Sequence, residues 1–300
     1  SYVRSYFRRL RRARPDDSVG TDDVDVQSEA GKGAGSTNST IRCRIASMAV
    51  SVLTDEEKFL FDLRGFVVIK EVLSESRCEE LIRLADDVWP RTDEDGPGRR
   101  TSHVSQWGND FLNLIDHETV LPYLIALIGS RLRLDHDYCL FMRRGAPPNP
   151  LHGGPRLFET DHWYYYQDGI MRNGLTVATW NLTPAPSGAG GFACIPGSHK
   201  TNFMRNVPME VRRFERRPDY LYQPPMDTGD VLIFTEALIH GTIPWDADHE
   251  RRTLLFKYSP PHSTWAKKPY NLEDYPNATE QQKRLFAPPS VEAHAPVTQD

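Results

Sequence analysis

Two histidines that lie far apart in this chain each stand where a metal ligand would be expected. His152 follows the apolar run 138–142, and His240 lies in the apolar segment 237–241. Arg251 follows shortly after the second histidine. Two histidines, often with one carboxylate, can hold a divalent metal ion and leave other positions on it open. A guanidinium nearby suits a carboxylate of a bound anion. The residue types are therefore those of a metal site with an anion-binding arginine beside it.

The elements that must bring these residues together read as a mainly β fold with flanking helices. The chain has 300 residues, of which 39% are hydrophobic and 23 are proline, enough to form a core and rich in turns. Helical patterns come first, and many short apolar strands separated by Gly and Pro follow. We expect a double-stranded β-helix (jelly roll), in which distant strand ends meet in the mouth of the barrel.

The expected elements can be placed approximately. A capping box at Thr54 starts a helix with the apolar Phe59, Leu60 and Leu63 along one face, and Gly65 ends it. A strand at 66–69, a helix from Ser74 to before Pro90 and a helix at 118–129 follow. Further strands are expected at 132–142, 174–182, 191–195, 230–234, 237–241 and 253–259.

The chain divides by composition. Residues 1–48 combine an arginine-rich start with a Ser-, Gly- and Asp-rich stretch that has few large apolar groups, so we expect disorder there. Residues 49–300 are expected to form a single jelly-roll domain. The long segment 200–228 between strands is expected to act as a lid over the site.

Charge and cysteine usage exclude several classes of protein. The net charge of −5 and a pI near 6.1 give no basic surface for nucleic acid. No apolar run is long enough to span a membrane. The four cysteines form no C-x-x-C pair and are expected to be buried free thiols of a cytoplasmic protein. The arginine-rich N-terminus also fits an organelle transit peptide, although the aspartates of 16–25 argue against one.

Three sequence motifs occur in a fixed order with the two histidines. Gly190–Lys200 reads G-G-F-A-C-I-P-G-S-H-K, residues 229–234 read G-D-V-L-I-F, and H-G-T at 240–242 precedes R-R-T-L-L at 251–255. In this combination the sequence resembles the phytanoyl-CoA dioxygenase family over roughly residues 53–262. The resemblance implies the cofactors Fe(II), 2-oxoglutarate and O₂, and hydroxylation of an aliphatic C–H bond of a small molecule.

The resemblance also assigns roles to residues. His152 and His240 are the implied metal ligands, and Arg251 the implied anchor of the distal carboxylate of 2-oxoglutarate. Thr242 is expected to add a hydroxyl hydrogen bond to that carboxylate, and Tyr138 and Trp180 to contact co-substrate or substrate. His199 lies in the P-G-S-H loop, which is a structural or substrate-edge turn in the family, and is not assigned to the metal. Arg252 points to the opposite face of its strand from Arg251.

One departure from the family pattern leaves the chemistry open. The family has H-x-D at the first ligand, whereas Gly154 occupies the Asp position here, and the chain contains no other H-x-D or H-x-E. In one explanation another carboxylate, such as Glu159 or Asp161, or a water completes the site, and the outcome is hydroxylation. In the other, chloride binds in the vacated position and the enzyme is a halogenase that chlorinates a C–H bond.

A third interpretation makes the protein a jelly-roll binding module without redox chemistry. Under the enzymatic interpretations the partner is a small-molecule substrate, and the arginines of 205–217 could meet an anionic one, such as a phosphate. The sequence predicts neither the identity of the substrate nor the oligomeric state.

Overall fold

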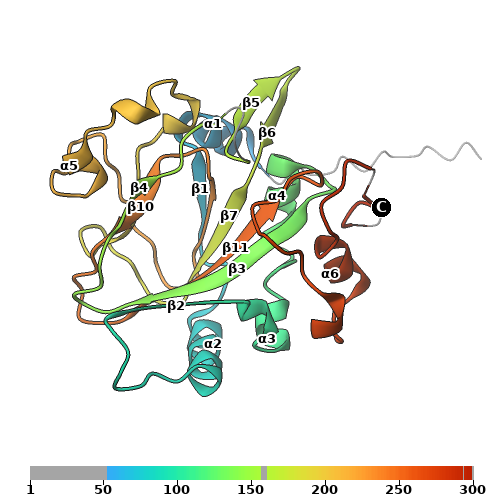
Figure 1. The fold of residues 1–300 in the computed structure, drawn as a ribbon, viewed down its shortest axis with the longest axis horizontal. Coiled ribbons are helices and arrows are strands. Elements are labelled where there is room, and N and C mark those ends of the chain that lie inside the picture. The colour runs from blue at the N-terminus through green and yellow to red at the C-terminus, as the bar shows by residue number, and fades with distance from the viewer. Residues whose placement is uncertain (1–52, 157–160, 293, 299–300) are drawn as a thin grey trace, which may run out of the picture. The chain divides into compact units, whose positions relative to one another are not determined.

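Two antiparallel sheets face each other in the computed structural model, which describes residues 53–156, 161–292 and 294–298 (Figure 1). The predicted N-terminal segment 1–48 lies outside these residues. The larger sheet has the strand order β1 (Phe66–Ile69), β9 (Val231–Thr235), β7 (Thr176–Asn181), β11 (Arg251–Ser259), β3 (Arg133–Met142), β2 (Gly98–Ser102). The smaller sheet has the order β4 (Asn149–His152), β10 (His240–Ile243), β8 (Gly191–Cys194). This arrangement confirms the predicted jelly roll.

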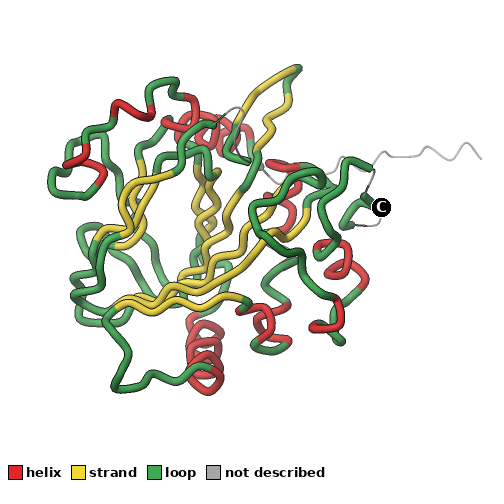
Figure 2. The backbone as a smooth tube through the Cα atoms, viewed as in Figure 1, coloured by secondary structure: helices red, strands yellow, loops and turns green. Residues whose placement is uncertain are grey.

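The remaining elements lie around the two sheets. A hairpin is formed by β5 (Tyr164–Gln167) and β6 (Ile170–Asn173). The helices are α1 (Asp55–Arg64), α2 (Glu75–Val88), α3 (Asn109–Leu112), α4 (Leu121–Ile128), α5 (Met209–Arg212) and α6 (Glu280–Leu285). Single-turn 3₁₀ helices occupy Val104–Gln106, Ser198–Lys200, Met204–Asn206 and Leu272–Asp274. Figure 2 shows how much of the backbone between these elements is loop.

Apolar side chains pack in three layers. The largest cluster joins α2, α3, α4 and α6 to the outer face of the larger sheet, through residues such as Leu81, Leu124 and Leu254. A second cluster, with Phe234 and Met142, fills part of the space between the sheets. A third cluster lies between the smaller sheet and the segment around α5. Residues of the larger sheet therefore alternate between a helix-covered face and a face that lines the barrel.

Helix α1 begins and ends as the sequence predicts, but its buried face differs. The Thr54 hydroxyl and the Glu57 carboxylate form the capping box, and Gly65 has φ +82° after the last helical residue. The buried side chain of this helix is Phe61, whereas Phe59 and Leu63 are exposed. The face that carries the apolar Phe59, Leu60 and Leu63 is therefore not the fully buried side of this helix.

Most predicted strands are found within a few residues, with one functional exception. The strand expected at 237–241 begins at His240, because residues 236–239 form a tight turn after β9. The turn carries Glu236 back toward the barrel interior. Strands β2 and β4 were not predicted, because Gly98–Ser102 and Asn149–His152 are polar and short.

Two expectations from composition can be compared with the structure. Cys78, Cys139 and Cys194 are free and buried, as predicted, and Cys43 lies outside the described residues. In the part of the chain that the structure describes, no helix has the length and apolar character needed to cross a membrane.

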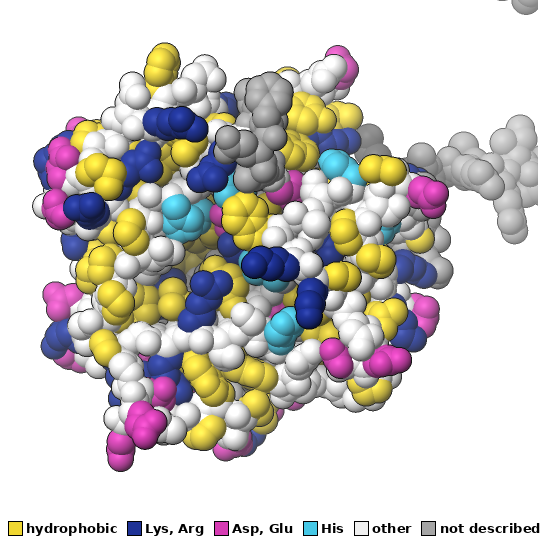
Figure 3. Space-filling view, viewed as in Figure 1, with side chains coloured by type: hydrophobic (Ala, Val, Ile, Leu, Met, Phe, Trp, Pro, Cys, Tyr) yellow, Lys and Arg dark blue, Asp and Glu magenta, His cyan; other side chains and the backbone are white. Residues whose placement is uncertain are grey.

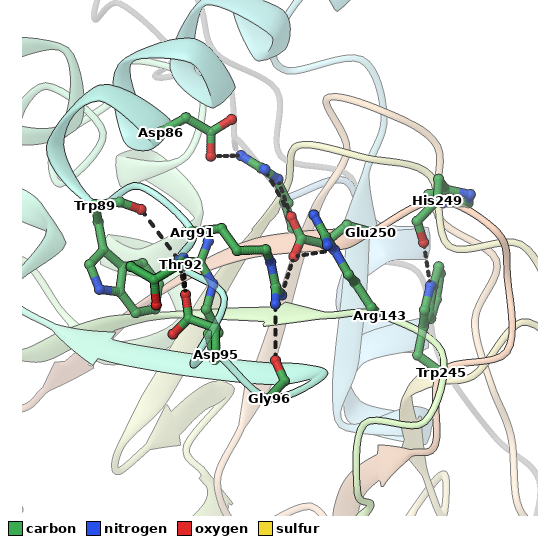
Figure 4. Close-up of polar contacts among 12 residues, drawn as sticks. Asp86, Trp89, Arg91, Thr92, Asp95, Gly96, Arg143, Trp245, His249 and Glu250 are labelled. Carbon is green, nitrogen blue, oxygen red and sulfur yellow. Dashed lines mark hydrogen bonds and ion pairs between the residues drawn. The ribbon is translucent and has the colours of Figure 1, made fainter.

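An ion-pair cluster fixes the start of β11 (Figure 4). The Glu250 carboxylate accepts hydrogen bonds from Arg91 and Arg252, each at 2.8 Å, and lies 3.3 Å from Arg143. Arg252 also donates to Asp86 of α2 at 2.8 Å. Because Arg252 is held on the outer face in this way, the neighbouring Arg251 must point into the barrel.

We predict that Glu250→Gln lowers the free energy of unfolding by about 2 kcal/mol, because the partly buried guanidinium groups lose their shared anion. Urea denaturation of the two proteins measures the effect. Asp87→Asn, which breaks the exposed Arg83–Asp87 pair of α2, is the matched control and should leave the midpoint nearly unchanged. Equal midpoints for Glu250→Gln and the wild type would show that the cluster contributes nothing to stability.

Candidate active site

The two predicted histidines lie side by side on the smaller sheet. His152 at the end of β4 is the register partner of His240 at the start of β10. Their ring centroids are 4.3 Å apart and the rings are tilted by 55°. Residues remote in the sequence are thus brought close enough to bind one ion.

Each histidine ring is oriented by a hydrogen bond to the backbone. The Nδ1–H of His152 donates to the carbonyl of Pro150, and that of His240 to the carbonyl of Leu238, both at 2.8 Å. A proton on Nδ1 leaves the Nε2 lone pair of each ring available. This is the tautomer that a metal ligand needs, and such carbonyl partners commonly orient metal-binding histidines.

A buried carboxylate completes the group. Ligand atoms of His152, Glu236 and His240 all lie within 4.8 Å of one another. The Oε2 atom of Glu236 is 3.8 Å from Nε2 of His240, and the Oε1 atom accepts a hydrogen bond from Lys257 at 2.6 Å. Two imidazoles and one carboxylate are a donor set that fits ferrous iron.

Sequence reasoning missed Glu236, although the chain carries a signal for it. The family pattern places the carboxylate two residues after the first histidine. Glu236 instead lies four residues before His240, within the mostly apolar run Val231–Ile239. An ionisable residue in such a run is rarely buried without a partner or a function.

The electrostatics of the group favour deprotonated ligands. Burial lowers the pKa of His240 to about 3, which keeps this imidazole neutral. Burial alone would raise the pKa of Glu236, but the charge of the neighbouring Lys257 ammonium holds it well below its usual range. Glu236 and His240 are therefore in the protonation state in which they bind a cation.

Two glycines after His152 allow the close approach of β4 to the turn before β10. Gly153 has φ +79°, and a Cβ there would lie 2.5 Å from the carbonyl of Leu238. Gly154 has φ +90°, and a Cβ there would lie 2.9 Å from the side chain of Met204. The end of the Met204 side chain, from the segment 200–228, thus lies against Gly154 where a side chain at this position would begin.

Arg251 reaches into the barrel without a carboxylate partner among the described residues. Its side chain is buried, its Nη1 is 3.6 Å from the sulfur of Met142, and its Nε has no hydrogen-bond acceptor. Burial lowers the pKa of Arg251 to about 10, so that it remains charged at neutral pH. A Cβ on Gly191 would lie 2.9 Å from its Nε, so glycine is required there. A buried guanidinium of this kind fits the carboxylate of a bound diacid.

Thr242 and Tyr138 lie near this group, and Trp180 does not. Thr242 follows His240 by two residues on β10, and so shares its face of the strand. Tyr138 on β3 has the ammonium of Lys257 5.5 Å from its ring centroid. Trp180 packs among the helices on the opposite face of β7, 5.2 Å from the ring of His117. The prediction that Trp180 contacts the co-substrate is not supported by this placement.

Other candidates take structural positions. Asp161 is buried and accepts a hydrogen bond from Ser259 at 2.7 Å, outside the group of metal-capable side chains, and Glu159 lies beyond the described residues. Burial raises the pKa of Asp161 to about 6. His199 contacts the carbonyl of Asp62 through Nε2 at 3.0 Å, which agrees with its exclusion from the metal site.

His162 is a further residue that the sequence did not single out. Its Nε2 lies 3.8 Å from Oε2 of Glu236, and its ring stacks on Trp265 at 4.8 Å. Burial lowers the pKa of His162 to about 4, so it adds no positive charge beside the carboxylate at neutral pH. It borders the metal-capable group from the side of the larger sheet.

The segment 200–228 covers the outer side of the smaller sheet, and its arginines are mostly engaged within it. Arg212 donates to the carbonyls of Met204 and Val207, and Arg216 pairs with Glu210 at 3.3 Å. Val211 and Phe214 pack on the sheet. These contacts do not support the prediction that arginines of 205–217 receive an anionic substrate.

A cavity of about 180 Å³ opens between the two sheets near Thr242 and Met142. Its wall also includes Arg100, whose guanidinium lies 3.9 Å from the ring centroid of Tyr138, and Asn149. Figure 3 shows histidine, lysine and arginine side chains gathered around a hollow on this face. The cavity provides an approach to the region of Arg251.

Solved structures with this fold include metal- and 2-oxoglutarate-binding proteins. HygX from Streptomyces hygroscopicus with nickel and 2-oxoglutarate bound aligns with a TM-score of 0.64 at 24% identity, covering 75% of this chain and 95% of that chain. SnoK, a non-haem alpha-ketoglutarate-dependent carbocyclase from nogalamycin biosynthesis, aligns with a TM-score of 0.53 at 18% identity, covering 72% and 88%. At these identities the likeness shows the shared fold.

The family follows from the sequence itself. Comparison with curated protein sequences gave no match. The family model described as Phytanoyl-CoA dioxygenase (PhyH) matches residues 61–253, more than half of the chain, and this range includes His152, Glu236, His240 and Arg251. The chain therefore belongs to the phytanoyl-CoA dioxygenase family.

Proposed function

We propose that this protein is an Fe(II)- and 2-oxoglutarate-dependent dioxygenase that hydroxylates an aliphatic C–H bond of a small-molecule substrate. The observation that carries the proposal is the convergence of His152, Glu236 and His240, with both imidazoles oriented by backbone carbonyls. Family membership supports the same assignment. Bound iron and 2-oxoglutarate would supply the activation of O₂ that C–H oxidation needs.

Different residues of this chain would bind the iron and the 2-oxoglutarate. His152, Glu236 and His240 would hold the iron on one side and leave the other side open. Arg251 would bind the distal carboxylate of 2-oxoglutarate, for which its unpaired Nε is available. Thr242, on the same strand face as His240, is placed to add a hydroxyl hydrogen bond. The surrounding apolar side chains would exclude water from the reacting groups.

The substrate is proposed to be a small molecule that enters between the sheets. A HygX structure contains hygromycin B together with nickel and 2-oxoglutarate, but fold likeness does not transfer a substrate. Arg100 at the wall of the cavity offers a cation, which supports an anionic group on the substrate. Arg212 and Arg216, which bind partners within the segment 200–228, give this idea no support.

Hydroxylation is favoured over halogenation by the carboxylate. Glu236 would supply the negative ligand that Gly154 lacks, and the end of the Met204 side chain lies against Gly154. Chloride as a co-substrate is therefore the second candidate. A non-catalytic binding module would need no metal-capable group of this kind, and it is the third.

We predict that anaerobic addition of Fe(II) and 2-oxoglutarate produces a weak visible charge-transfer band. His240→Ala should abolish the band, and Arg251→Gln should weaken 2-oxoglutarate binding at least about tenfold, because a charge-assisted hydrogen bond contributes about 1.5–3 kcal/mol. His199→Ala and Arg83→Gln, which breaks the exposed Arg83–Asp87 pair of α2, are controls outside the site and should keep the band. A wild-type protein without a band would favour the binding module.

We predict that Gly154→Asp lowers thermal stability and does not strengthen Fe(II) binding, because its backbone has φ +90° and its side chain meets Met204. Melting temperature and Fe(II) affinity, measured by competition with a chelator, check this. Sodium chloride should leave the charge-transfer band unchanged relative to sodium sulfate at equal ionic strength. A chloride-dependent shift of the band, or tighter iron binding by the variant, would instead support the halogenase.

A further inference from the structure

Glu236, in the turn after β9, is buried together with a lysine of β11, a strand of the same larger sheet. Lys257 lies on the barrel-facing side of β11, and its Nζ is 2.6 Å from Oε1 of Glu236. The side chains of Lys257 and Glu236 are only 11% and 3% exposed. A buried ammonium is costly unless it is paired, so this pair is a fixed part of the interior.

The two oxygens of the Glu236 carboxylate have different surroundings. Oε1 accepts the hydrogen bond from Lys257, whereas Oε2 lies 3.8 Å from Nε2 of His240. An ion held by both histidines would therefore be bound by Oε2, because Oε1 already accepts the hydrogen bond from Lys257. The carboxylate is arranged to bind through one oxygen.

We propose that Lys257 is a positioning residue that holds Glu236 as a one-oxygen metal ligand and offsets its charge for the binding of 2-oxoglutarate. This inference rests on the proposed function. A carboxylate that bound through both oxygens would occupy a position that 2-oxoglutarate or O₂ needs. The ammonium prevents this by keeping Oε1 in a hydrogen bond of its own.

The charge of Lys257 has a second consequence. Glu236 alone would cancel part of the positive charge of the ion, and the incoming 2-oxoglutarate is itself a dianion. Lys257 neutralises the carboxylate, so the ion and Arg251 keep their full attraction for the co-substrate. The ring of Tyr138, 5.5 Å from the ammonium, adds a cation–π contact that helps hold it in place.

A purely structural ion pair would look similar in the structure but behave differently on mutation. Removal of Lys257 would then lower stability and leave ligand binding by the folded protein unchanged. In the positioning role, removal frees Oε1 to approach the metal and changes 2-oxoglutarate binding in the folded, iron-loaded protein. Residues that orient metal ligands commonly affect affinity by about tenfold to a hundredfold.

Lys257→Met tests the role, because methionine is unbranched and uncharged. We expect the variant to retain Fe(II), measured by competition with a chelator. Its 2-oxoglutarate dissociation constant should rise about tenfold or more, and its charge-transfer band should shift, because the coordination of Glu236 changes. Lys70→Met, which removes the lysine from the Lys70–Asp230 pair outside the barrel, is the matched control and should bind 2-oxoglutarate like the wild type.

An unchanged band position and 2-oxoglutarate affinity in Lys257→Met would overturn the proposal, and so would a complete loss of Fe(II) binding. If this variant does not fold, Lys257→Gln retains an N–H donor without the charge, and the same comparison of affinity decides. Failure of the proposed function is recognised separately, because the wild-type protein would then give no band at all.

Discussion

The buried carboxylate of Glu236 is the constraint on which the site depends. It lies between the ammonium of Lys257 on the larger sheet and the imidazole of His240 on the smaller sheet. An ionised carboxylate in the interior is tolerated only with cations or donors around it, so the two sheets must face each other at this separation. The tight turn at residues 236–239 makes this possible, because it returns the chain from β9 to β10 with Glu236 and His240 on the same side.

Close backbone approach then links the first histidine to that turn. Gly153 lies against the carbonyls of Glu236 and Leu238, at distances that leave no room for a side chain. The same contact brings His152 beside His240, and Met204 closes over Gly154 from the covering segment. In the proposed site, Glu236 from another element would take the role of the H-x-D aspartate that the family has and this chain lacks.

The jelly roll and the two histidines could be predicted, because apolar runs separated by turn residues and the order of the motifs can be read directly from the sequence. The prediction failed for residues whose position depends on how the chain packs. Every residue of β7 is buried, so alternation could not reveal that Trp180 faces the helices. Glu236 was missed because its proximity to His152 exists only after β4 and β10 pair. The exposed face of α1, with Phe59 and Leu63, shows that an apolar stripe alone does not identify the buried side.

Strand β11 carries three cations, which differ in their partners. Arg252 is paired with Glu250 and Asp86 on the outer face, and Lys257 is paired with Glu236 inside the barrel. Arg251, equally buried, has no carboxylate at ion-pair distance among the residues that the structure describes. A buried guanidinium without an anion opposes folding, and simple packing would not retain it. Its persistence beside Gly191, which makes room for it, is most simply explained by an anion that arrives with the co-substrate.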